Sequence, residues 1–269
     1  MATLRHPAVA GRFYPGGPNA LRSEVRQYVA SKTAATPAIA CLVPHAGYMY
    51  SGHVAGAVYA EVLVPRRVIV LCPNHTGFGP PLSIMMEGAW ETPLGNVPID
   101  AELAAALKAR CGLLETDASA HRSEHGIEVQ LPFLLDRQPE VTFVPIVVGT
   151  GRFENLASLG EALAETIARI DDDILLLASS DMNHYESDAV TRRKDALAIE
   201  RLLAMDARGL FEAIAEHDIS MCGFGPAVAI LTAAGGLGAK KASLVRYATS
   251  GDASCDRSSV VGYAGVIFR

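Results

Sequence analysis

The sequence is poor in basic charge. Its 23 Lys and Arg residues are outnumbered by 29 Asp and Glu, which gives a formal net charge of −6. The densest basic run is Arg192–Lys194, and a run this short is typical of a solvated helix face. A protein that neutralises a phosphate backbone needs many more cationic contacts. We therefore expect no nucleic-acid partner.

Paired cysteines and long apolar runs are also absent from the sequence. The five cysteines form no CxxC pair, which argues against a disulfide framework and favours reduced thiols in a cytosol. No run approaches the roughly 18 apolar residues that suggest a membrane span. The first residues, MATLRHPAVAGRFYP, lack the apolar core of a signal peptide. We expect a cytoplasmic protein that does not contact the membrane.

Hydrophobic residues make up 50% of the chain, which is enough for a substantial core. Short apolar runs alternate with segments of helical period, and this pattern predicts an α/β fold with a mainly parallel sheet covered on both faces. The predicted strands are 38–43, 67–72, 141–148, 174–178, 244–248 and 260–268, with 83–87 a further candidate. The predicted helices are 20–31, 53–63, 101–110, 124–136, 154–170, 187–205, 207–216 and 227–234. No repeat or change of composition divides the chain, so we predict a single domain over residues 1–269.

Three of the predicted strands end in polar clusters that contain histidine. His45 follows the first strand, His75 follows the second, and Asp181 and His184 follow the strand at 174–178. Because the carboxyl ends of parallel strands meet at one edge of a sheet, we expect these side chains to converge. Imidazole is the commonest protein ligand for transition metals. Three such strand ends favour a metal site over three unrelated loop histidines.

Other candidate residues are less certain from the sequence alone. Cys222, in the stretch MCGFGP, is either a core cysteine or a metal-binding thiolate favoured by the helix that follows. Glu124 and His125 are either helix-capping residues or a pair facing the cleft that supports the site residues or transfers a proton. Ser179 precedes Asp181 without the GxSxG elbow, which argues against a serine nucleophile.

Seven motifs, in this order, resemble the Memo family, whose bacterial and archaeal members are often called AmmeMemoRadiSam system protein B. They are AGRFYP (10–15), PHAGYMYSG (44–52), PNHTG (73–77), EHGIEVQLPFL (124–134), SSDMNHY (179–185), MCGFGP (221–226) and SSVVGYAG (258–265). The match spans nearly the whole chain, and the combination of motifs is specific. The resemblance implies a single-domain α/β sandwich like that of the protocatechuate 4,5-dioxygenase type of extradiol dioxygenases.

The resemblance also implies a set of site residues. The implied metal ligands are His45, His75 and Cys222, with Asp181 and His184 as a nearby pair. His125 matches a further histidine of the family pattern. The chain departs from some relatives at Thr76, where they carry a second, adjacent histidine.

Cys222 stands where the dioxygenases have a glutamate ligand. A thiolate is softer than a carboxylate and draws the site towards copper, zinc or sulfur-ligated iron. We therefore expect one transition-metal ion, iron or copper with zinc as a further candidate, and redox or oxygenase-type activity on an unidentified small molecule. His184 is expected to be the acid–base group, oriented by Asp181, with His125 and Tyr185 lining the pocket.

Two alternatives remain open. The cleft could be a non-catalytic module that binds a peptide or a small molecule, or Cys222 could be the nucleophile of a hydrolase with His184 as its base. The family resemblance further implies an AMMECR-type protein and a radical-SAM protein as partners.

Overall fold

The computed structural model describes residues 3–30 and 34–269. Its strands are β1 (Leu4–Arg5), β2 (Ala40–Val43), β3 (Arg67–Pro73), β4 (Leu82–Ile84), β5 (Ala89–Thr92), β6 (Gly95–Pro98), β7 (Glu115–Thr116), β8 (Thr142–Val148), β9 (Ile174–Ser179), β10 (His184–Glu186), β11 (Ala242–Thr249) and β12 (Val260–Phe268). Its helices are α1 (Pro18–Tyr28), α2 (Tyr48–Glu61), α3 (Ala101–Arg110), α4 (Ser119–Arg122), α5 (Leu131–Arg137), α6 (Phe153–Ile167), α7 (Asp188–Leu203), α8 (Ala207–Glu216), α9 (Phe224–Gly236) and α10 (Gly251–Ser254), with a 3₁₀ turn, η1, at Glu128–Gln130.

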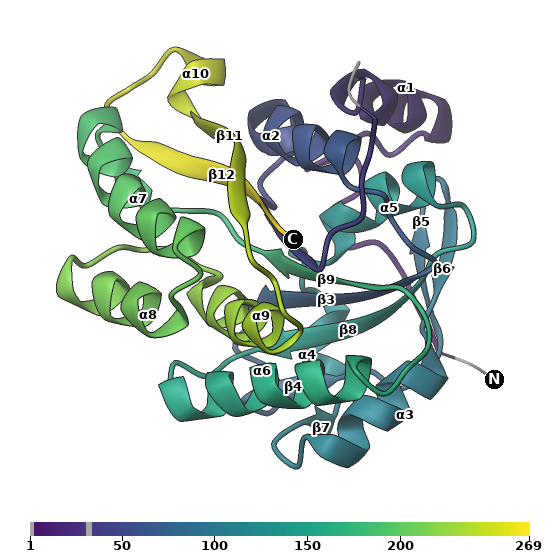
Figure 1. The fold of residues 1–269 in the computed structure, drawn as a ribbon. Coiled ribbons are helices and arrows are strands. Elements are labelled where there is room, and N and C mark those ends of the chain that lie inside the picture. The colour runs from purple at the N-terminus through teal and green to yellow at the C-terminus, as the bar shows by residue number, and fades with distance from the viewer. Residues whose placement is uncertain (1–2, 31–33) are drawn as a thin grey trace.

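A mixed sheet runs through the middle of the molecule in the order β10-β12-β2-β9-β3-β8-β4-β7, with β11 paired to β12. Its four central strands, β2, β9, β3 and β8, are parallel, whereas β12 and β4 join them antiparallel. Helices cover both faces: α1, α2 and α5 lie on one side, and α3, α6 and α9 lie on the other (Figure 1). The predicted single-domain α/β architecture is confirmed.

The strand β2 is apolar along its whole length and β9 is apolar up to Ala178, as is usual for parallel strands buried on both faces. Successive residues of β3 alternate between the two cores: Ile69 and Leu71 belong to the core that contains α6 and α9, whereas Val68 and Val70 belong to the core that contains α2 and α5. This alternation fixes the register of the strands. The same register determines which residues emerge at the carboxyl edge of the sheet.

The strand β8 contains Pro145 and yet lies inside the sheet. From the sequence alone, a proline at this position predicts a strand nearer the edge, but β8 pairs with β3 on one side and with β4 on the other. The pairing with β4 stops at Ile146, one residue after the proline. Pro145 therefore lies just outside the stretch of β8 that pairs with β4. Its missing N–H removes no hydrogen bond to β4.

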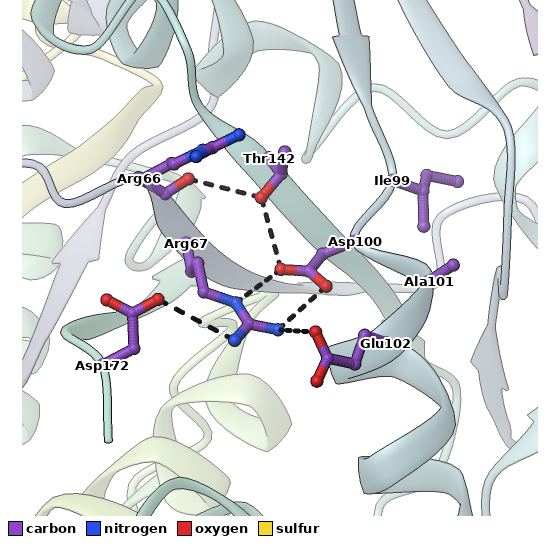
Figure 2. Close-up of a pocket in the computed structure, with 8 residues that line it drawn as sticks. All are labelled: Arg66, Arg67, Ile99, Asp100, Ala101, Glu102, Thr142 and Asp172. Atoms are coloured by element: carbon purple, nitrogen blue, oxygen red, sulfur yellow. Dashed lines mark hydrogen bonds and ion pairs between the residues drawn. The ribbon is translucent and has the colours of Figure 1, made fainter. Parts of the chain in front are cut away.

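The opposite, amino-terminal edge of the sheet carries a network of ion pairs (Figure 2). Arg67, at the start of β3, donates to both carboxylate oxygens of Asp100 at 2.7 and 3.0 Å. Asp100 also caps α3 by accepting the N–H of Leu103 at 3.0 Å. A cavity of about 470 Å³ lies beside this network, but Arg67 is neutralised within it by Asp100 and, more distantly, by Asp172. The network ties α3 to the sheet, so its role is structural.

None of the helices described here has the length and apolar character that crossing a membrane requires.

Candidate metal centre

The carboxyl ends of three neighbouring parallel strands bring the predicted residues together. His45 follows β2, His75 follows β3, and Asp181 follows β9, which lies between them. The imidazole rings of His45 and His75 lie with their centroids 5.0 Å apart. The expected convergence of His45 and His75 is confirmed.

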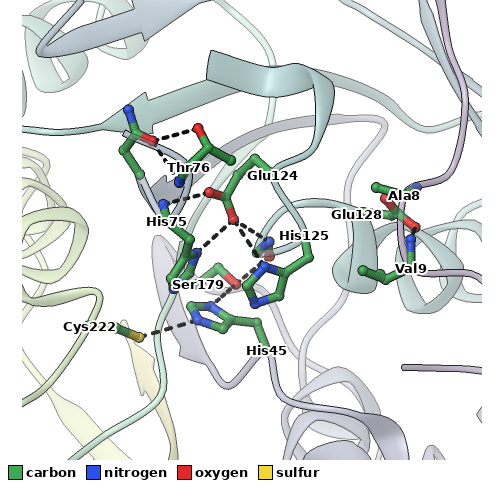
Figure 3. A network of polar contacts seen from close by, with 12 residues as sticks. Ala8, Val9, His45, His75, Thr76, Glu124, His125, Glu128, Ser179 and Cys222 are labelled. Atoms are coloured by element: carbon green, nitrogen blue, oxygen red, sulfur yellow. Dashed lines mark hydrogen bonds and ion pairs between the residues drawn. The ribbon is translucent and has the colours of Figure 1, made fainter. Parts of the chain in front are cut away.

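His125 joins the two strand-end histidines. One ligand atom each from His45, His75 and His125 lies within 4.8 Å of the other two, which is close enough to hold a metal ion. Among the described residues this group has three members, and Cys222 is not one of them. The His125 ring lies 5.3 Å from that of His45 and 4.4 Å from that of His75 (Figure 3).

His125 is carried by a turn rather than by the predicted helix. The helix expected over 124–136 is replaced by a non-helical turn, the 3₁₀ turn η1 and α5. Gly126 explains the turn, because a Cβ atom there would lie 2.9 Å from the Cβ of Cys72 and 3.4 Å from Nδ1 of His45. The backbone must pass close to the other two strand ends, and this brings His125 into the group.

Glu124 is the buried carboxylate that orients His75. It accepts hydrogen bonds from the backbone N–H of His75 and from its Nδ1, both at 2.8 Å, and from the N–H of Gly126 at 2.8 Å. Nδ1 of His125 lies 3.5 Å from the same carboxylate. Burial by itself would raise the pKa of Glu124, but the hydrogen bonds from His75 and Gly126 lower it to about 2. Of the two interpretations of Glu124 and His125, the structure supports the one in which Glu124 faces the cleft. Glu124 orients the histidines and caps no helix.

A chain of hydrogen bonds fixes the tautomer of His45. The side-chain N–H₂ of Gln130 donates to the carbonyl of Pro44 and to Oγ of Ser179, and the hydroxyl of Ser179 donates to the carbonyl of Gly126. Since Ser179 has only one proton, its oxygen must accept from Nδ1 of His45, which lies 3.0 Å away. Nε2 of His45 therefore keeps its lone pair for a ligand bond.

Burial keeps two of the imidazoles neutral. Burial, together with the charge of His75, lowers the pKa of His45 to about 3. Burial, together with the charge of His45, lowers the pKa of His125 to about 4. Metals bind the neutral form of imidazole, so both rings are in the binding form at pH 7. Histidines that bind metals usually donate Nδ1–H to an oxygen, and Nδ1 of His45 and of His75 contacts Ser179 and Glu124 in this way.

Cys222 lies at the edge of the histidine group, just before α9. Its Sγ is 3.2 Å from Nε2 of His45 and 3.3 Å from the backbone N of Asp181. Burial raises the pKa of this thiol, and the charge of Asp181 raises it further. In the metal-free protein these two effects favour the thiol form of Cys222 over the thiolate. A protonated thiol also argues against Cys222 as the nucleophile of a hydrolase.

The sequence predicted that Asp181 orients His184, but these two residues have different hydrogen-bond partners. The carboxylate of Asp181 accepts the backbone N–H of His45 at 2.7 Å, and burial raises its pKa. Nδ1 of His184 donates to the carbonyl of Ser220 at 2.9 Å, so within the described part of the chain Ser220 orients this ring. Tyr185 is 78% exposed and contacts the His184 ring edge-on at 5.4 Å.

Asp195 supports the segment that leads into β10, which begins at His184. It accepts the N–H of Asn183 at 2.8 Å and the hydroxyl of Tyr247 at 2.6 Å, and the side chain of Asn183 accepts two hydrogen bonds from Ser220. Burial raises the pKa of Asp195 to about 6, above its ordinary value of 3.8. Between these two values the folded protein binds more protons than the unfolded chain, so this group's contribution to stability falls as pH rises.

We expect the free energy of unfolding of Asp195→Asn, relative to the wild type, to rise by about 2 kcal/mol between pH 4 and pH 7. The reason is that the variant avoids burying an ionised carboxylate at the higher pH. Urea unfolding at several pH values measures the difference. Asp171→Asn, at an exposed aspartate, is the matched control and should show no such trend. A pH-independent difference for Asp195→Asn would contradict the prediction.

The site also contains Gln130, which the sequence does not single out, and it gives Ser179 and Glu124 roles that depend on distant contacts. Gln130 and Ser179 fix the ring of His45, and Glu124 fixes that of His75. Gln130 lies in the motif EHGIEVQLPFL, but its partners are Tyr59, Pro44 and Ser179, all far away along the chain. Only the folded arrangement shows that these residues act on the histidine group.

Comparisons with known proteins give one consistent result. A family model described as "Memo-like protein" matches residues 5–267. A MEMO1 family protein of Methanopyrus kandleri is 42% identical over 98% of this chain and 99% of its own length. Another, of Methanothermobacter thermautotrophicus, is 41% identical over 97% of this chain and 99% of its own. Among solved structures, an uncharacterized protein from Escherichia coli K12 has a TM-score of 0.54 with 14% identity, covering 85% of this chain and 98% of that protein; this likeness concerns the fold alone.

Proposed function

Because the chain belongs to the Memo family, we propose that it binds one transition-metal ion at the carboxyl edge of its sheet and uses it in redox or oxygenase-type chemistry on a small molecule. The observation that carries the proposal is the group of His45, His75 and His125, whose ligand atoms lie within 4.8 Å of one another. Imidazole ligands suit iron, copper and zinc, and iron or copper would supply electron transfer or activation of oxygen.

We propose His45 and His75 as two of the ligands and Cys222 as the third. A nitrogen and a sulfur bound to one tetrahedral metal lie roughly 3.5 Å apart, given metal–ligand lengths of about 2.0 and 2.3 Å. The 3.2 Å between Nε2 of His45 and Sγ of Cys222 is close to this value. Metal binding would displace the thiol proton, because cysteine binds metals as the thiolate.

The remaining polar residues have separate roles in this proposal. Glu124, Ser179 and Gln130 hold the imidazole rings through Nδ1 or through the chain that fixes it, so that Nε2 of His45 and of His75 can bind the metal. His184 is the proposed acid–base group, since its Nδ1 is bound to the carbonyl of Ser220 and its Nε2 is left to exchange a proton. Three protein ligands leave coordination positions open for a substrate. The substrate and the partner proteins implied by the resemblance stay predictions.

The third ligand can be tested with two single substitutions, Cys222→Ser and His125→Gln. We expect Cys222→Ser to weaken iron or copper binding by more than about 10-fold, whereas His125→Gln should weaken it less, because loss of a ligand exceeds the effect of a neighbouring group. Competition titrations on anaerobically purified protein measure the affinity, and a metal–thiolate absorption band should vanish only in Cys222→Ser.

The reverse order of the two effects would identify His125 as the third ligand. Wild-type metal affinity in both variants would contradict a site in which either Cys222 or His125 is the third ligand. Cys255→Ser, at an exposed cysteine, is the matched control for loss of a thiol and should bind metal as the wild type does.

A further inference from the structure

A second cavity, of about 640 Å³, lies between the N-terminal segment and α4. Residues 3–9 form one wall, and Met85 and residues around α4 form the other. None of the histidines of the metal centre lines it, and neither does Cys222. Its volume is within the range of small-molecule sites, which is about 300–1,000 Å³.

Two arginines give this cavity a positive charge. Arg12 and Arg122 both line it, both are exposed, and neither guanidinium has a hydrogen-bond or ion-pair partner among residues 3–30 and 34–269. The other basic side chains of the lining have acidic partners: Arg5 pairs with Glu128, and Nδ1 of His6 lies 2.6 Å from a carboxylate oxygen of Glu91. No described residue of the lining is acidic.

The rest of the lining is largely apolar. Leu4, Pro7, Val9 and Met85 contribute hydrophobic surface, and Leu4 is 40% exposed even though it is a large aliphatic residue. A cavity with hydrophobic walls and a few polar groups that fix orientation has the usual composition of a ligand site. The two arginines are the groups that would fix orientation here.

We propose that this cavity binds a small organic anion, one that joins a carboxylate or phosphate group to an apolar body. The planar guanidinium matches both oxyanions with paired N–H donors, and the charge assists each hydrogen bond. In a chain with a net charge of −6, two unpaired arginines in a shared cavity favour an anionic ligand over a neutral or cationic one. The apolar walls would hold the body of the molecule.

Calorimetric titration of the full chain with phenyl phosphate and with benzoate tests the proposal, and benzyl alcohol serves as the neutral probe. Trp90, the single tryptophan, gives a second signal, because its ring lies 4.2 Å from the guanidinium carbon of Arg5 in the cavity lining. We expect at least one of the two anions to bind and benzyl alcohol to bind much more weakly. The ratio of the two anion affinities then identifies phosphate or carboxylate as the preferred group.

Substitution of Arg12→Gln together with Arg122→Gln should weaken anion binding by about 10-fold or more, since hydrogen bonds to charged groups are lost. Arg110→Gln with Arg193→Gln, at two exposed arginines elsewhere, is the matched control and should leave it unchanged. His45→Gln with His75→Gln should also leave it unchanged, which separates this cavity from the metal centre. The proposal would be overturned if the double variant of Arg12 and Arg122 bound the anions as tightly as the wild type does. It would also be overturned if the wild type bound neither anion at millimolar concentration.

Discussion

Replacing His45 and His75 together by glutamine is expected to abolish stoichiometric metal binding. Each residue follows one of the neighbouring parallel strands β2 and β3, and each belongs to both possible ligand sets. Loss of an outer-shell partner typically weakens a metal site by about 10–100-fold, and loss of two ligands should exceed this. Elemental analysis after anaerobic purification, with the metal-to-protein ratio as the readout, measures the effect.

The matched control is a variant in which two histidines outside the proposed metal centre are replaced. His6→Gln with His217→Gln is suitable, because both residues are exposed and neither lies at the carboxyl edge of the sheet. The control should keep the wild-type metal content and the same circular dichroism. A full metal content in the variant that lacks His45 and His75 would reject the proposed centre.

The strand ends could be predicted because their signals are local. An apolar run followed by proline and histidine identifies a buried strand and the residue just beyond it, and β2 and β3 both have this form. The parallel arrangement follows from the alternation of strands and helices. Together these patterns were enough to predict that His45 and His75 lie close together, without knowledge of any contact between them.

The surroundings of the histidines could not be predicted, because they depend on contacts between distant segments. The turn at Glu124 has the apolar spacing of a helix, and the sequence gives no sign that Gly126 must fit between Cys72 and His45. The hydrogen bonds from Gln130 likewise reach strands β2 and β9, far from it in the chain. Such contacts replaced the predicted helix with a turn and brought His125 into the group.

The first residues of the chain are also fixed by a distant contact. The carboxylate of Glu128, fully buried in η1, forms an ion pair with Arg5 and accepts the N–H groups of Ala8 at 2.8 Å and Val9 at 3.0 Å. It also accepts the hydroxyl of Tyr14 at 2.7 Å. Through this one side chain, residues 5–14 are held against the turn that carries His125 (Figure 3).

Replacing Glu128 by alanine is therefore expected to lower the free energy of unfolding by about 3–5 kcal/mol, the usual effect of leaving a buried ion-pair partner uncompensated. Arg5, only 6% exposed, would keep its charge without a carboxylate partner, and the amides of Ala8 and Val9 would lose their acceptor. Urea unfolding measures the loss, with Glu212→Ala, at an exposed glutamate, as the matched control.

Two further variants separate the charge from the other hydrogen bonds of Glu128. Glu128→Gln keeps an accepting oxygen and the shape of the side chain, so it should lose less stability than Glu128→Ala. Replacing the ion pair by Arg5→Met with Glu128→Leu should not restore wild-type stability, because Tyr14 and the two amides remain without an acceptor. Since Arg5 also donates to the carbonyl of Glu124 at 2.7 Å, Glu128→Ala should weaken metal binding as well. Stability and metal affinity both equal to those of the wild type would show that the N-terminal segment does not support the centre.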